Sequence, residues 1–85
     1  MQFDGAKIKE QGVTFGIVVV KSYVLRSPSK EQIRASFITF FGNIPIILMA
    51  QDSHGIPTYD GRPDIVRFLA KINPARIPWK HYTAA

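Results

Sequence analysis

The chain has 85 residues, 46% of them hydrophobic and 20% charged, which is typical of a folded globular domain rather than a disordered segment. It contains no cysteine, which excludes disulfides, a thiol nucleophile and thiolate zinc sites. The first residues do not resemble a signal peptide, and the longest apolar run, residues 44–50, is too short to span a bilayer. We therefore expect a single cytoplasmic domain over residues 1–85, with no membrane role.

The formal net charge is +5, with 11 Lys and Arg against 6 Asp and Glu. A basic surface attracts anionic partners such as nucleic acids or acidic proteins. The basic residues are spread along the chain without a run of like charge, which favours a solvated surface over a dedicated nucleic-acid site.

The first predicted element is a short edge strand over residues 5–10, where apolar and polar residues alternate loosely. Gln11 and Gly12 predict a tight turn, because glycine tolerates the positive φ that such turns need. Residues 13–20 are rich in β-branched residues and apolar at both alternating sets of positions, which predicts a central strand covered on both faces. Gly16 within this strand indicates a bulge or a close approach of another part of the chain.

A helix is predicted to start at residues 27–29, because either serine can cap it and Ser29 with Gln32 has the capping-box spacing. An apolar stripe at helical spacing follows, with polar residues on the opposite side. The stripe comprises Ile33, Phe37, Phe40 and Phe41, and the polar side comprises Lys30, Glu31 and Arg34. Gly42 and Asn43 predict the end of this helix.

Residues 44–50 predict a second buried strand, in which Pro45 is tolerated only at the start. The order strand, helix, strand predicts that it pairs in parallel with residues 13–20. A polar turn over residues 51–55 leads to a short strand over residues 56–59, and Pro57 places that strand at a sheet edge.

Pro63 and Asp64 are favoured in the first turn of a helix, so a second helix is predicted from there to Asn73-Pro74. Its buried stripe comprises Ile65, Phe68, Leu69 and Ile72. Residues 75–85 are too apolar for a free tail, so we expect them to pack on the domain or on a partner. The predicted fold is a small single-sheet α/β domain, or the related α+β class, of order (β)β-α-β-β-α with helices packed on the sheet.

From Ile44 to Ile72 the chain resembles the C-terminal half of thioredoxin-like folds. An Ile-Pro pair precedes a strand, a short hairpin with glycine follows, and a closing helix packs behind. In that family the proline equivalent to Pro45 is cis and lies beside a Cys-x-x-Cys motif. Because this chain has no cysteine, the resemblance implies part of a fold and carries no redox function.

The polar residues between positions 52 and 64 include a candidate ligand or catalytic cluster, formed by Asp52, His54 and Asp60. Asp-Ser-His-Gly is also the composition of a tight turn, and catalytic partners more often converge from separate elements. No His-x-His or Glu-x-x-His spacing supports a metal, and no phosphate-loop glycine pattern supports an anion site at residues 60–64. We expect a turn here, with no metal and no cofactor.

Basic residues of the second helix and the tail are candidates for nucleic-acid binding: Arg62, Arg67, Lys71, Arg76 and Lys80. In the tail they are interleaved with aromatic residues, a combination that contacts phosphates and stacks on bases. Aromatic residues are also enriched at protein interfaces, and the candidate interface residues are Ile77, Trp79 and Tyr82.

Because the sequence holds no convincing catalytic constellation, the leading hypothesis is a non-catalytic protein-interaction or regulatory module. Its partner is another protein or a second copy in a homodimer. The alternative is a nucleic-acid-binding protein that uses the basic helix and tail, and a second alternative is a small enzyme with its site at residues 52–64.

Overall fold

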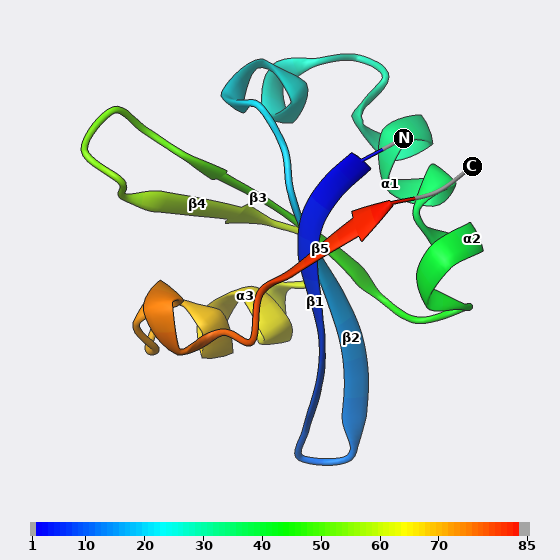
Figure 1. The fold of residues 1–85 in the computed structure, drawn as a ribbon, viewed down its shortest axis with the longest axis vertical. Coiled ribbons are helices and arrows are strands. Elements are labelled where there is room, and N and C mark those ends of the chain that lie inside the picture. Colours follow the sequence, from blue (N-terminus) through cyan, green and yellow to red (C-terminus); the bar gives the residue numbers. More distant parts are fainter. Residues whose placement is uncertain (1, 84–85) are drawn as a thin grey trace.

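The computed structural model describes residues 2–83, which form one mixed five-stranded sheet with helical segments on both faces (Figure 1). The strands are β1 (Gln2–Glu10), β2 (Val13–Val19), β3 (Ile46–Gln51), β4 (Pro57–Asp60) and β5 (Lys80–Thr83), in the spatial order β4-β3-β2-β1-β5. The α-helices are α1 (Lys30–Ser36), α2 (Ile38–Phe41) and α3 (Pro63–Leu69), and the 3-10 helices are η1 (Ser22–Arg26) and η2 (Pro74–Arg76). The predicted class, a small single-sheet domain with helices packed on the sheet, is confirmed.

Strands β1 and β2 form an antiparallel hairpin closed by the predicted two-residue turn. Glu10 pairs with Val13, and the two residues between them, Gln11 and Gly12, have φ values of 51° and 79°. Positive φ at both central positions gives the turn a twist that matches the twist of the strands. The first strand begins earlier than predicted, and it is an interior strand over residues 2–5 because β5 pairs with it there.

Strands β2 and β3 pair in parallel, as predicted, with Gly16 opposite Ile46 and Val19 opposite Met49. The two faces of the sheet carry separate apolar cores, as expected for central strands covered on both sides. The core under α3 includes Phe15, Ile17, Ile47, Leu69 and Ile77, and the core under α1 and α2 includes Phe3, Val18, Phe37, Phe41 and Leu48. Gly16 marks a close approach, since a Cβ atom there would lie 3.1 Å from the Phe41 ring.

The first predicted helix is broken at Phe37 into α1 and α2. The predicted capping box does not form: the Ser29 side chain makes no capping hydrogen bond, and its N–H instead donates to Ser27 Oγ at 3.1 Å. The predicted apolar stripe is buried at Phe37 and Phe41, whereas Phe40 is 39% exposed. Gly42 ends α2 with a φ of 87°, as predicted.

Strand β4 lies at the sheet edge, as Pro57 predicted. Helix α3 ends at Leu69, earlier than expected, because the following N–H groups bond three residues back: Lys71 to Phe68 and Ile72 to Leu69. This i to i+3 pattern tightens the last turn and leaves Ile72 half-buried.

The segment predicted as a packing tail forms an edge strand over its described residues, and residues 84–85 lie outside them. Strand β5 runs antiparallel to β1, from Lys80 opposite Gly5 to Thr83 opposite Gln2. Tyr82 stacks on Phe3, with ring centroids 5.0 Å apart and an interplanar angle of 13°.

The thioredoxin-like resemblance holds only as a strand, hairpin and helix over residues 46–69. Among residues 2–83 every peptide bond is trans, so Pro45 differs from the cis proline of the thioredoxin-like family.

Candidate functional site

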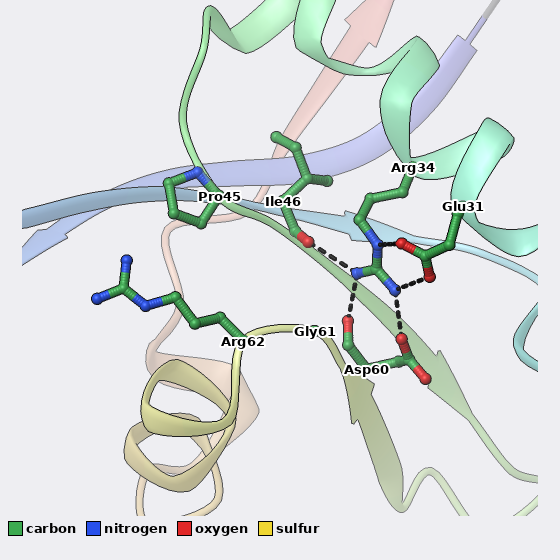
Figure 2. A pocket seen from close by; sticks show the side chains of 7 residues that line it. All are labelled: Glu31, Arg34, Pro45, Ile46, Asp60, Gly61 and Arg62. Atoms are coloured by element: carbon green, nitrogen blue, oxygen red, sulfur yellow. Dashed lines mark hydrogen bonds and ion pairs between the residues drawn. The ribbon is translucent and has the colours of Figure 1, made fainter.

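A shallow hollow of about 370 Å³ lies between α1 and the end of β4, and Arg34 is among the residues that line it (Figure 2). The side chain of Arg34 is only 16% exposed, although the sequence predicted it on the solvated side of the helix. That prediction is wrong because α1 packs across the point where β3 begins and β4 ends.

Every N–H of the Arg34 guanidinium has an acceptor. Nε and Nη2 donate to the Glu31 carboxylate at 2.9 and 3.0 Å, and Nη2 also binds the Asp60 carboxylate. Nη1 donates to the main-chain carbonyls of Ile46 and Asp60, both at 2.8 Å. Because a guanidinium has five N–H donors, none remains for a ligand.

Asp60 accepts from both α1 cations: Lys30 Nζ lies 2.9 Å from Oδ2, and Arg34 binds Oδ1. Partial burial opposes the charge of Asp60, but these two hydrogen bonds outweigh it and lower the pKa of the carboxyl. Burial likewise opposes the charge of Arg34, but the hydrogen bonds that Arg34 donates to Glu31 and Asp60 outweigh it and raise the pKa of Arg34 above the usual value. The cluster is therefore ionised and internally neutralised at neutral pH.

Gly61 makes room for this cluster, since a Cβ atom there would lie 3.2 Å from Arg34 Nη1 and 2.5 Å from Ile47 Cδ1. Figure 2 shows Arg62 pointing away from Arg34, and its Nε donates to Asp64 Oδ1 at 2.8 Å. The side chains around the hollow therefore join α1 to β3 and β4. We call this set the clamp; it comprises Lys30, Glu31, Arg34 and Asp60. The spacing of three residues between Glu31 and Arg34 is the one signal for it in the sequence, and pairs at this spacing also occur on exposed helix faces.

The predicted cluster of Asp52, His54 and Asp60 is not brought together. Asp52 Oδ1 accepts the N–H groups of His54 and Ile56 at 2.8 and 2.9 Å, which makes residues 52–56 the predicted turn. Asp60 lies at the other end of β4, in the Arg34 cluster. Within residues 2–83 no group of three or more His, Asp or Glu side chains is arranged to hold a metal ion.

The predicted nucleic-acid residues are all exposed, but they are spread over several elements. Arg62 precedes α3, Arg67 is in its last turn and Lys71 follows it, whereas Arg76 lies in η2 and Lys80 opens β5.

The aromatic residues of the segment over residues 75–83 pack within the domain. Trp79 packs against the α3-side core and donates from Nε1 to the Pro74 carbonyl at 2.9 Å, while Tyr82 covers Phe3. The third predicted interface residue, Ile77, is only 4% exposed.

An unpaired stretch of backbone lies along β1. Strand β5 covers β1 only from Gln2 to Gly5, and within the described residues no backbone segment pairs with residues 6–10 on that side. The hairpin of β1 and β2 projects beyond β5 and α3 in the lower part of Figure 1. We call residues 6–10 of β1, on the side where β5 has ended, the open edge.

An apolar groove of about 250 Å³ runs beside the open edge on the α3 side of the sheet. Its apolar wall comprises Ile8, Phe68, Ile72, Ile77 and Pro78, and its rim carries Glu10 and Arg76. Ile8 and Ile77, from opposite ends of the chain, both line this groove. We call this set of residues the β1 groove; two of its members, Arg76 and Ile77, were candidate residues in the sequence.

No family model, no curated protein and no solved structure matches the chain. Among residues 2–83 no helix is both long enough and apolar enough to cross a membrane. The cytoplasmic location expected from the sequence remains a prediction.

Proposed function

We propose that the protein is an interaction module that binds an extended segment of another protein as an additional strand along the open edge. The observation that carries the proposal is the unpaired backbone of residues 6–10 beside the β1 groove. An added strand gains affinity from main-chain hydrogen bonds, and pockets for its alternate side chains supply specificity.

The register of the hairpin indicates which backbone groups are available. A two-residue turn joins the members of a hydrogen-bonded pair, here Glu10 and Val13, and such pairs alternate with non-bonded ones along an antiparallel ladder. By this alternation the N–H and C=O groups of Lys7 and Lys9 face away from β2, toward the open edge. At about 3.4 Å per residue, residues 6–10 offer a docking length of roughly 17 Å.

Selection from a random peptide library displayed on phage tests the proposal. We expect wild-type protein to enrich peptides that protect the amides of Lys7 and Lys9 from hydrogen exchange when bound. The variant Lys9→Pro should lose this enrichment, because proline removes one outward N–H while leaving the bonds between β1 and β2 in place. Enriched peptides that protect other amides, or no enrichment at all, would overturn the proposal. The hydrogen-exchange experiment uses wild-type protein alone, so it tests the proposal even if Lys9→Pro unfolds.

Nucleic-acid binding is the alternative, through Arg67 in the last turn of α3 and Lys71 just after that helix, both of which are exposed. A short random DNA duplex, titrated at low and at high salt, discriminates the two functions. Phosphate contacts weaken steeply as salt rises. Salt-sensitive DNA binding that is lost in Arg67→Glu/Lys71→Glu would favour the alternative, whereas we expect no DNA binding at physiological salt.

A further inference from the structure

The two sides of the open edge differ in chemistry, because successive side chains of a strand point to opposite faces of the sheet. Ala6 belongs to the α3-side core, and Ile8 packs against that core and lines the β1 groove. Lys7 and Lys9 therefore point to the other face, that of α1 and α2, where both are exposed. Neither lysine takes part in an ion pair within the described residues.

We infer that the partner of the open edge is an acidic extended segment, in which Asp or Glu alternates with an apolar residue. Such a strand would set its carboxylates beside Lys7 and Lys9 on one face and its apolar side chains beside Ile8, over the β1 groove, on the other. Opposite charges on neighbouring strands attract, and apolar neighbours bury area. This inference rests on the proposed function and adds the chemistry of the partner to it.

The same lysines disfavour a second copy of the chain as the occupant. In a continuous sheet made by two copies, antiparallel pairing centred on Ile8 would set each Lys7 opposite the Lys9 of the other copy. Shifting the register by two residues sets Lys7 opposite Lys7, or Lys9 opposite Lys9. Like charges directly opposite one another destabilise a strand pair, and lysines at a sheet edge commonly prevent such self-pairing.

The test uses a fluorescein-labelled, end-capped octapeptide in which glutamate alternates with valine, with binding followed by fluorescence anisotropy. One comparison peptide replaces glutamate by lysine, and another has the same composition with the glutamates grouped at one end. We expect the alternating acidic peptide to bind wild-type protein about tenfold more tightly than either comparison peptide. Its affinity should fall as salt rises, because the attracted charges are exposed.

A charge exchange makes the test sharper. Lys7→Glu/Lys9→Glu should weaken the acidic peptide about tenfold and strengthen the lysine-valine peptide. The matched control, Arg67→Glu/Lys71→Glu, changes the net charge equally at residues that belong to neither the open edge nor the β1 groove, and should leave both affinities within about twofold. If the control variant weakens the acidic peptide as much as the edge variant does, general charge attraction explains binding and the inference is overturned.

The remaining outcomes separate this inference from the proposed function. If the lysine-valine peptide binds wild-type protein as tightly as the acidic peptide, and both protect the amides of Lys7 and Lys9, the open edge accepts strands without regard to charge. The inference then fails and the proposed function stands. A light-scattering mass of twice the chain mass that drops to the monomer in Lys9→Pro would instead identify a second copy as the occupant and overturn the inference.

Discussion

Arg34 binds Asp60 at two places, its main-chain carbonyl and its carboxylate, and so holds the end of β4 against α1. The same guanidinium binds the carbonyl of Ile46, where β3 begins. A single side chain thereby satisfies backbone acceptors at the end of the ladder between β3 and β4, where Leu48 pairs with Asp60. Polar groups that lose such partners without regaining water are costly.

We expect Arg34→Lys to destabilise the protein by about 2 kcal/mol. An ammonium on a flexible stem cannot bind two carbonyls and two carboxylates together, so acceptors in the clamp are left without partners. Urea denaturation followed by circular dichroism measures the free energy of unfolding. The control Arg67→Lys, at an exposed site, should change it by less than about 0.5 kcal/mol, and equal losses would show that Arg34 holds nothing together.

Gly61→Ala should cost about 1–3 kcal/mol, because the new methyl group would meet the side chains of Ile47 and Arg34 and because the φ of 159° is one that residues with a side chain rarely adopt. Gly55→Ala is the informative comparison: no atom lies within 4 Å of its added Cβ, and its φ of 79° alone costs about 1 kcal/mol. Thermal unfolding of both variants compares a site with crowding and a positive φ with a site that has a positive φ alone. A smaller loss for Gly61→Ala than for Gly55→Ala would contradict the close packing around the clamp.

Stability should fall in acid because the pKa of Asp60 is lowered in the folded protein. Burial opposes this shift, and the hydrogen bonds from Lys30 and Arg34 overcome it. A group with a lowered folded pKa stabilises the fold above its usual pKa of 3.8, and that contribution is lost as the pH falls through the folded value.

The variant Asp60→Asn should therefore be less stable than wild type at pH 7, with the difference shrinking between about pH 5 and pH 2. Chemical denaturation across this range measures the difference. A constant gap between the two proteins would mean that the Asp60 charge contributes nothing to stability.

Ile77→Ala should destabilise the protein by about 2–4 kcal/mol, because Ile77 is 4% exposed and belongs to the α3-side core. Ile56→Ala makes the same chemical change at a side chain that is 61% exposed, and should cost less than about 0.5 kcal/mol. Denaturant midpoints of the two variants suffice for the comparison. Similar midpoints would place Ile77 outside the core.

The sequence predicted the elements whose signals are local. The β-branched run at 13–20 and the apolar run at 44–50 became β2 and β3, and Pro57 placed β4 at an edge. In each case neighbouring residues carry the cause: stiff side chains that favour strands, or a missing N–H donor.

The features that were missed depend on distant residues. Lys80–Thr83 has weak strand character in the sequence. It forms β5 because its backbone pairs with β1 and because Tyr82 stacks on Phe3. In the sequence, Arg34 resembles any arginine on a helix surface. Its buried hydrogen bonds depend on the end of β4, which lies beside it only in the folded chain. The open edge is likewise set by where β5 stops, which no local pattern indicates.

The pairing of β1 with β5 has a consequence for how fast the protein folds. Gln2 lies opposite Thr83, so this ladder closes a loop of nearly the whole chain. Folding rates fall as contacting residues become more distant in sequence, because the entropy of loop closure is lost before the contacts form. The β1–β2 and β3–β4 hairpins can form locally, whereas β5 must wait for a partner at the opposite end of the chain. The strand that limits the length of the open edge is thus the one we expect to join the sheet last.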